Sequence, residues 1–349
     1  MQLPLHQYIE RKKATIKTER LLSDRVINLL YSRIREVSPF LFEQVVSKRV
    51  SALLGFLNYD LLNRPLPGSG KGLSSKIFKE LEINPEEIWE NQEGLEGIAA
   101  IDTYRKLFER QIRYWECRPM EAAPNSVVAP ADSRVLIGSF PVQSNLLIKN
   151  KFFSYSELIG TDKAQWLSAF DQGDYAVFRL TPDKYHYNHT PVAGRILDTY
   201  EINGNYHSCN PGAVVQSVTP YSKNRRILTI IDTDVENGSQ VGLVAMVEIV
   251  ALMIGRITQC YSRERYDNPY PLEKENVIQK GQPKSLFAPG SSTTVLIFQK
   301  NKVQFSSDLV ENQNRSDVES RFTLGFKTPL VETDLHVRET IAKSKTAEQ

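Results

Sequence analysis

Residues 288–298 read APGSSTTVLIF, and this stretch indicates how the second half of the chain is built. Its Pro-Gly pair is typical of a turn, and Thr293–Phe298 is a run of β-branched and large apolar residues that predicts a strand. Similar short runs recur after Pro119. They are Val127–Val128, Arg134–Ile137, Tyr175–Leu180, Val214–Ser217 and Ile227–Ile231. Their spacing predicts a core of mostly antiparallel strands, interrupted by helices near Ser154–Leu158 and Lys163–Phe170.

The sequence before Pro119 has the pattern of helices. Apolar residues repeat at i, i+3, i+4 and i+7, and Pro39 divides the first of these stretches, so two helices are expected there. The expected segments are helix at Thr18–Leu62, a Pro/Gly/Ser-rich loop at Asn63–Ser75 and helix at Pro85–Tyr114. The expected fold class is α+β, with a helical N-terminal region at 1–117 followed by a mostly antiparallel β core at 118–349.

Composition limits the classes of function. The chain of 349 residues is long enough for about two domains, and 41% hydrophobic with 24% charged residues is typical of a globular protein. Lys and Arg number 43 against 41 Asp and Glu, a balance that argues against a dedicated nucleic-acid binder. Three widely spaced cysteines argue against a disulfide framework or a zinc ribbon. No apolar signal-peptide core opens the chain, and its longest apolar stretch, Gly242–Gly255, is too short to span a membrane. We expect a soluble or peripheral protein inside the cell.

Two of the five histidines lie close together in Leu180–Gly194, LTPDKYHYNHTPVAG. The flanking prolines and Gly194 favour a strand-to-loop transition in which His186 and His189 reach one cleft. Two other interpretations stay open. Both rings are ordinary surface or core histidines, or they ligate a metal ion together with His207, although no carboxylate or cysteine stands at a helpful ligand spacing.

The stretch Ala288–Thr294 also has two interpretations. It is a plain turn into a strand, or Gly290–Ser291 is a self-processing bond. A serine hydroxyl can attack the preceding carbonyl, and glycine allows the backbone shape that the attack needs. The ester so formed can eliminate and leave a ketoacyl group in place of the serine. Asp132, between two β-like runs, is either a turn former or the acid that orients a histidine.

Six ordered blocks between Arg118 and Phe305 resemble the phosphatidylserine decarboxylase family. The blocks are RPMEAAPNSVVAPADSRV, PVQSNLLIKNKFFSYSELIG, LTPDKYHYNHTPVAG, YHSCNPGAV, KNRRILTIIDT with VAMVEIVALMIGRI, and IQKGQPKSLFAPGSSTTVLIF. The resemblance implies a lyase of phospholipid biosynthesis that converts phosphatidylserine to phosphatidylethanolamine and CO₂. It also implies autocatalytic cleavage of a zymogen into a beta chain, 1–290, and an alpha chain, 291–349, which stay together as a heterodimer.

The resemblance implies roles for single residues as well. Ser291, cleaved from Gly290, would become a covalent pyruvoyl group, which forms a Schiff base with the substrate amine and accepts electrons as CO₂ leaves. His189 would activate the Ser291 hydroxyl, with Asp132 orienting its imidazole. His186 would protonate the carbanion. No metal or diffusible cofactor is implied.

Several residues depart from the family's pattern. They are Ser133, Lys184, Tyr187, Val250, Pro283-Lys284-Ser285 and Ser292. They keep two alternatives open: the same chemistry on a soluble amino acid, and a processing-dead relative that binds lipid or acts as a scaffold. The basic, amphipathic N-terminal segment suits either contact with anionic lipid or packing on the β core. We expect a cytoplasmic protein, peripheral on the inner face of the cell membrane, with no nucleic-acid partner and with a homodimer as one form of assembly.

Overall fold

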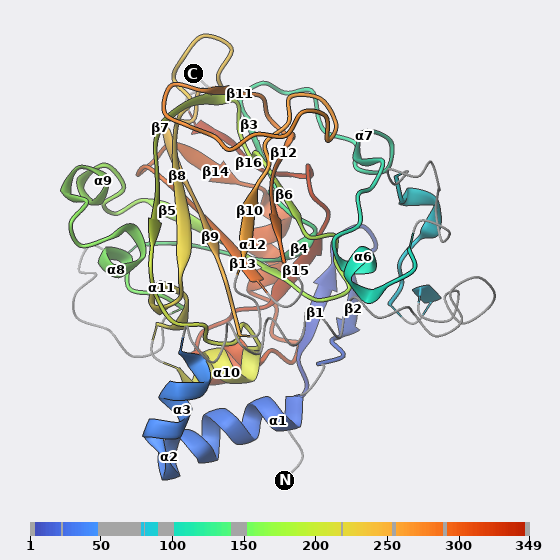
Figure 1. Ribbon diagram of the computed structural model, residues 1–349, viewed down its shortest axis with the longest axis vertical. Coiled ribbons are helices and arrows are strands. Elements are labelled where there is room, and N and C mark those ends of the chain that lie inside the picture. Colours follow the sequence, from blue (N-terminus) through green and yellow to red (C-terminus); the bar gives the residue numbers. More distant parts are fainter. Residues whose placement is uncertain are drawn as a thin grey trace.

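A ten-stranded sheet forms the centre of the protein (Figure 1). The computed structural model describes residues 4–21, 24–47, 78–79, 81–89, 101–140, 152–217, 219–252, 256–288 and 292–345. In spatial order the strands are β11 (Val277–Ile278), β7 (Gly194–Ile202), β8 (Arg226–Asp232), β9 (Leu243–Ile249), β13 (Ser292–Phe298), β5 (Asp174–Leu180), β4 (Ser133–Ser139), β15 (Glu332–Leu335), β1 (Gln7–Glu10) and β2 (Thr15–Thr18). All neighbours are antiparallel except β1 and β15. The expected α+β class is confirmed.

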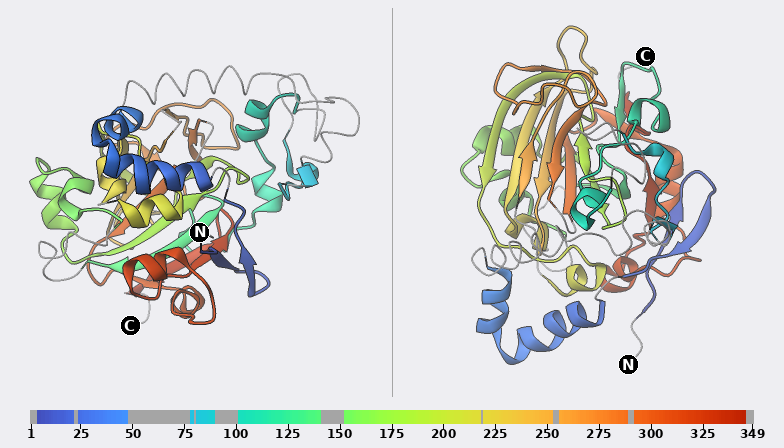
Figure 2. Two further views of the ribbon diagram at one scale, coloured as in Figure 1. Left: turned by 90° about the horizontal axis from the view of Figure 1, so that it is seen from below. Right: turned by 45° about the vertical axis from the view of Figure 1, so that its right-hand side comes forward.

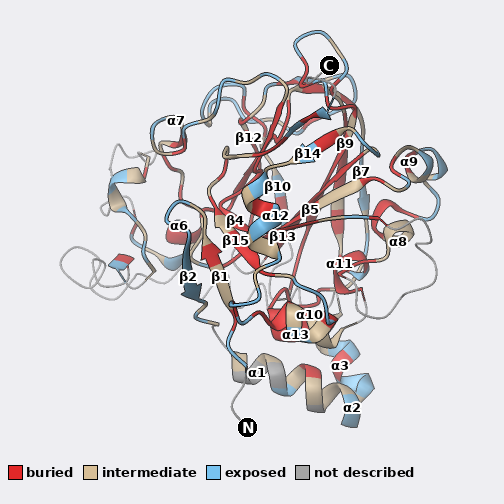
Figure 3. Cartoon of the chain, turned by 180° about the vertical axis from the view of Figure 1, so that it is seen from behind, coloured by how far each residue is buried: buried red, intermediate tan, exposed pale blue. Residues whose placement is uncertain are grey.

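Both faces of the central strand β13 are buried. Leu296 and Phe298 belong to one apolar cluster, and Val295 and Ile297 belong to another. Because side chains of a strand alternate between faces, the two clusters lie on opposite sides of the sheet. This explains why the sequence of β13 is a continuous apolar run, and Figure 3 shows the buried strands within a more exposed surface.

Two three-stranded sheets accompany the large sheet. One has the order β10 (Ile257–Gln259), β12 (Pro283–Phe287) and β6 (Tyr187–His189). The other has the order β14 (Val303–Phe305), β16 (Thr340–Ser344) and β3 (Ser126–Val128). The first small sheet contains His189, His186 lies immediately before its strand β6, and its strand β12 precedes β13 along the chain.

Among the described residues, six short helices lie within the β-rich part. They are α8 (Tyr155–Ile159), α9 (Ala164–Ala169), α10 (Pro211–Gln216), α11 (Pro220–Lys223), α12 (Ser307–Gln313) and α13 (Arg321–Phe326). The expected helices at α8 and α9 are confirmed, whereas the strand expected at Val214–Ser217 is wrong because this segment ends α10. The Asn210 side chain caps that helix by accepting a hydrogen bond from Gly212 N, and Pro211 occupies the first turn.

The N-terminal region is not purely helical. Residues 7–18 form the β1–β2 hairpin, and β1 joins the large sheet next to β15. Ile9 of β1 is fully buried against Val318 and Val331, so pairing with distant parts of the chain fixes this strand. The chain then forms α1 (Asp24–Leu29), a π-helical turn at Leu30–Ile34, α2 (Arg35–Val37) and α3 (Pro39–Val46). The expected break at Pro39 is confirmed, since α3 starts at this proline.

The continuous helix expected at Pro85–Tyr114 is wrong. The described part of this segment holds a 3₁₀ turn (Pro85–Glu87) and α6 (Tyr104–Phe108), while α7 (Tyr114–Cys117) begins where the expected helix ends. Ile88 instead forms an antiparallel bridge with Ile112. The loop expected at Asn63–Ser75 lies outside the described residues. Helices α1 to α3 lie at one end of the molecule, beyond the sheet and next to α10 (Figure 2). Within the described residues, no helix has the length and apolar character that a membrane span requires.

Candidate active site

The small sheet leads directly to the expected cleavage bond. Phe287, the last residue of β12, donates its backbone N–H to the carbonyl of His186, at 3.1 Å. Ser292 then begins β13 opposite Leu180 of β5. Residues 289–291 lie outside the described residues, and with them Gly290 and Ser291. Both flanks of the bond are nevertheless fixed, one beside His186 and the other at the end of β5.

His186 immediately precedes β6 and His189 ends it, and their side chains point to opposite sides of this extended segment. The Asn188 amide oxygen accepts a hydrogen bond from the Thr294 hydroxyl of β13, at 2.8 Å. Because side chains alternate along an extended chain, His186 lies on the face of Asn188, towards β13, and His189 lies on the other. The His186 ring is buried and stacks on Phe108 of α6, with 3.5 Å between ring centroids. Its Nδ1 is 2.7 Å from the Lys184 carbonyl. Of the two imidazoles, His186 therefore faces the start of β13.

His189 is held by hydrogen bonds at both ring nitrogens. Its Nδ1 is 2.9 Å from the Gly281 carbonyl, and its Nε2 is 2.9 Å from the hydroxyl of Tyr185. A carbonyl only accepts, so Nδ1 carries the proton and Nε2 accepts the Tyr185 hydroxyl. Tyr185 is also 2.8 Å from the hydroxyl of Tyr266, which bonds to the backbone of Ile112. Burial lowers the pKa of His189 to about 3, so its imidazole is neutral at physiological pH.

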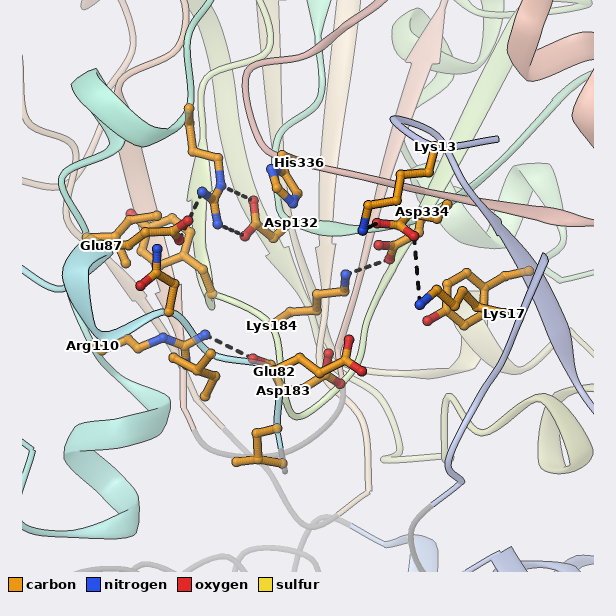
Figure 4. Close-up of a pocket in the computed structure, with 18 residues that line it drawn as sticks. Lys13, Lys17, Glu82, Glu87, Arg110, Asp132, Asp183, Lys184, Asp334 and His336 are labelled. Carbon is orange, nitrogen blue, oxygen red and sulfur yellow. Dashed lines mark hydrogen bonds and ion pairs between the residues drawn. The ribbon is translucent and has the colours of Figure 1, made fainter. Parts of the chain in front are cut away.

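Asp132 forms a buried ion pair with Arg118 (Figure 4). The guanidinium donates to both carboxylate oxygens, at 3.1 and 2.8 Å, and Val337 N donates to one of them, at 2.8 Å. Burial alone would raise the pKa of Asp132, but Arg118 outweighs it and holds this pKa well below its usual range. Asp132 and His189 share a neighbourhood because His189 N donates to the Pro130 carbonyl, at 2.6 Å. Their side-chain hydrogen bonds go to different partners.

A polar pocket of about 260 Å³ lies on the Asp132 side (Figure 4). The β1–β2 hairpin, residues 81–87 and the Asp132 loop contribute to its walls. Its charges are of both signs and largely paired. Lys184 Nζ is 2.5 Å from Asp334, and Arg118 also contacts Glu87 at 3.0 Å. Lys184, one of the departures from the family's pattern, is therefore neutralised inside this pocket.

The metal site considered for the histidines does not form in the described part of the chain. His207 packs against Tyr31 and Phe42, on the α1–α3 side. The one described group with metal-ligand spacing is His6, Glu19 and Glu332. Arg179 donates hydrogen bonds to both of these carboxylates, so a protein cation already occupies the position that an ion would take.

Sequence reasoning missed a buried charge pair next to the processing segment. Lys284 Nζ lies 2.7 Å from Glu248 of β9 and 2.8 Å from the side-chain oxygen of Gln259, and both charged side chains are fully buried. The Ser285 hydroxyl donates to the same carboxylate. Two of the departures before Gly290 thus share one partner. The signal that could have found this pair is Glu248, a lone charge within an apolar run.

The comparisons with known proteins identify the family of this chain. The sequence profile of the phosphatidylserine decarboxylase family matches residues 104–323, which is more than half of the chain. The chain belongs to the phosphatidylserine decarboxylase family. The matched region includes Asp132, His186, His189 and position 291.

Individual relatives extend the family match over most of the chain. A phosphatidylserine decarboxylase proenzyme of Fusobacterium nucleatum is 29% identical over 332 residues, 92% of this chain and 96% of the relative. The proenzyme of Clostridium tetani is 26% identical over 93% of this chain and 95% of the relative. That of Chlamydia trachomatis is 32% identical over 67% and 71%. Most of the N-terminal region thus falls within the span shared with the first two family members.

Proposed function

We propose that this protein is a self-processing decarboxylase that converts phosphatidylserine to phosphatidylethanolamine and CO₂, with Ser291 as the processed residue. The observation that carries the proposal is the position of the 289–291 connection. It joins the end of β12, beside the buried His186, to the start of the central strand β13. A serine at this junction follows a glycine, and the end of β12 just before it lies beside the imidazole of His186. Self-cleavage requires such a serine with a group that can take up its proton.

The surroundings of position 291 fit a pyruvoyl group made from the chain. The Ser292 hydroxyl is buried and has no hydrogen-bond partner among the described residues, so a donor stands unused beside position 291. When present, the pyruvoyl carbonyl supplies the electron sink that decarboxylation of an amino acid needs. The first residue of the alpha chain would hold it, and β13 would fix its direction.

The two histidines suit different tasks. His186 faces the start of β13, which suits a group that gives a proton to the substrate after CO₂ has left. His189 is neutral, as a general base must be before it takes a proton. Its free electron pair points to Tyr185, so His189 would act on Ser291 only after this hydrogen bond opens. We propose that Asp132 supports the loop that carries His189. It does so through its hydrogen bonds with Arg118 and Val337.

The cleaved chains would remain one molecule. The alpha chain, 291–349, supplies β13 between β9 and β5, β15 between β4 and β1, and β16 between β14 and β3. Each of these strands is interior to its sheet. Separating the chains would therefore break all of these pairings except β14–β16, which lies within the alpha chain, and this supports a stable heterodimer.

A lipid substrate is favoured over a soluble amino acid. The alternative of a soluble amino-acid substrate was motivated by Lys184 and Tyr187, which depart from the family's pattern. Lys184 pairs with Asp334, and Tyr187 packs against Tyr185 and Tyr266, on the face of β6 turned away from β13. These two departures therefore do not reshape the space next to position 291.

We also propose that helices α2 and α3 contact the inner face of the cell membrane. Val37, Phe40 and Leu41 are 86%, 77% and 50% exposed, and they lie on consecutive turns at the end of the molecule beyond the sheet (Figures 1 and 2). Exposed apolar side chains of this size, clustered on short helices, suit the boundary between head groups and acyl chains.

Intact-mass analysis of the purified protein tests the proposed function. A cleaving chain of 39.8 kDa should give fragments of about 33 and about 7 kDa, the smaller one blocked by a pyruvoyl group at its first residue. Ser291→Ala should leave one full-length species, and Ser139→Ala, at the exposed end of β4, is the control that should still cleave. CO₂ release from phosphatidylserine vesicles should follow cleavage. An intact wild-type chain that still decarboxylates would contradict the mechanism, and an intact inactive one would favour the processing-dead alternative.

A further inference from the structure

A second, smaller pocket of about 60 Å³ lies beside the start of β13. Its walls are Leu180–Pro182, Ser208–Asn210 and the N-terminal stretch Glu19–Leu21 with Ile27 of α1. Leu180 pairs with Ser292, and the Thr293 hydroxyl contacts the Cys209 sulfur at 3.1 Å. Two of the three walls are thus attached to the first residues of β13, immediately after position 291.

One wall of this pocket presents an unused polar group. Thr181 lines the pocket and is only 5% exposed, yet its hydroxyl has no hydrogen-bond partner within the described chain. A buried hydroxyl without a partner destabilises a protein, so such a group is retained most readily where a ligand completes it. This observation is independent of the family match.

Among the described charged residues around the pocket, one positive charge has no opposite charge paired with it. Arg179 donates to both Glu19 and Glu332, and Glu19 also contacts Arg134, so this group is balanced within itself. Arg20 also lines the pocket but is exposed, and within the described residues it forms no ion pair. The mouth of the pocket is therefore suited to an anion.

We propose that this pocket is the head-group subsite, with Thr181 bonding to the serine moiety and Arg20 binding the phosphodiester. The proposal rests on the proposed function and names residues for it. A cation on the carboxylate that leaves as CO₂ would stabilise the ground state more than the transition state, which would slow the reaction. The phosphodiester keeps its charge throughout, so an exposed arginine suits it better.

The size and position of the pocket agree with a serine moiety inside it and a phosphodiester at its mouth. At about 15 Å³ per water molecule, the pocket holds roughly four waters, enough for the polar part of serine but not for glycerol and acyl chains. Its wall at Ile27 belongs to α1, and α2 and α3 continue from there. A phospholipid with its head group in the pocket would therefore extend its acyl chains towards the exposed apolar residues of α3.

The first test is steady-state kinetics of the mature enzyme on short-chain phosphatidylserine. Arg20→Ala should raise KM about tenfold and leave kcat within about twofold, while Arg20→Lys should restore most of the loss. Arg195→Ala removes an exposed cation on β7 and is the matched control for bulk charge. Thr181→Val should lower kcat/KM about fivefold or more without lowering the unfolding midpoint, because it deletes an unpaired hydroxyl.

The second test needs no catalysis. Binding of soluble glycerophosphoserine and of free serine to the Ser291→Ala protein is measured by calorimetry. Arg20→Ala should weaken the first about tenfold and leave the second unchanged, since free serine has no phosphate. Unchanged glycerophosphoserine affinity in Arg20→Ala and Thr181→Val would overturn the subsite. A wild-type protein that binds glycerophosphoserine but releases no CO₂ would contradict the proposed function and leave the subsite unaffected.

Discussion

The hydroxyl of Tyr185 lies 2.9 Å from Nε2 of His189, the ring nitrogen left unprotonated because Nδ1 donates to the Gly281 carbonyl. Burial raises the pKa of Tyr185 well above its usual value, so its hydroxyl stays protonated and can donate. Tyr185→Phe removes this donor. We expect self-cleavage to quicken about fivefold, because a hydrogen bond worth about 1 kcal/mol no longer has to open before Nε2 can take a proton. The measurement is the rate at which the full-length band disappears on denaturing gels.

The control for this change is Tyr200→Phe, which also deletes a tyrosine hydroxyl, one that donates to the carbonyl of Ile159. Tyr200 lies on β7, and its variant should cleave at the wild-type rate. Equal rates for Tyr185→Phe and wild type would show that the Tyr185 hydrogen bond has no part in processing.

Stability should fall as the pH is lowered from about 6.5 to 4. Burial lowers the pKa of His189 to about 3 and those of His207 and His336 to about 4, whereas all three lie near 6.5 in the unfolded chain. The unfolded state therefore binds more protons in this window, so the free energy of unfolding decreases as protons are added. Each group contributes up to about 1.4 kcal/mol per pH unit. Urea unfolding at pH 7, 6 and 5 measures the slope, and His207→Gln should reduce it. A free energy that is constant across these pH values would contradict the burial argument.

The buried pair of Arg118 and Asp132 should respond unequally to removal of either partner. Arg118→Met leaves the Asp132 carboxylate buried without its cation, which should lower the free energy of unfolding by about 3–5 kcal/mol. Asp132→Asn should cost less because Arg118 keeps Glu87 at 3.0 Å. The double variant should recover part of the loss. Chemical denaturation of all three in the Ser291→Ala background separates stability from processing. A larger loss for Asp132→Asn than for Arg118→Met would refute this ordering.

The exposed apolar residues of α2 and α3 should govern attachment to vesicles. Val37→Asp with Phe40→Asp should reduce co-sedimentation with anionic vesicles by about tenfold or more, because charge at these positions opposes insertion. Val277→Asp, at an exposed apolar position on the edge strand β11, is the control and should sediment like wild type. Self-cleavage should be unchanged in both. Full attachment of the double variant would place the membrane contact elsewhere.

The local sequence pattern was sufficient to predict several strands of the sheet. β5, β8 and β13 are short β-branched runs bounded by turn residues, and they form as expected. Val214–Ser217 looked similar but is helical, because the capping Asn210 and Pro211 start a helix before it. The β1–β2 hairpin could not be foreseen, since only Ile9 is fully buried in β1 and its neighbours are more than 300 residues away.

For the candidate site, the sequence supplied candidate residues and none of their contacts. Family resemblance selected Asp132, His186, His189 and Ser291, but it gave no geometry. The hydrogen bonds of His189 to Tyr185 and Gly281 depend on how β6 meets the loop before β12, a relation that no spacing in the sequence encodes. The pairing of Lys284 with Glu248 is likewise specific to this chain's own packing.

The central place of β13 has a consequence for the lifetime of the protein. A prosthetic group made from residue 291 would be attached to the strand that begins at Ser292 and has neighbours on both sides, so it could not be exchanged as a diffusible coenzyme can. Chemical damage to that group, such as reduction, or a transamination that leaves the substrate nitrogen on it while the substrate departs as an aldehyde, would be permanent. The cell would have to renew this activity by synthesising new polypeptide.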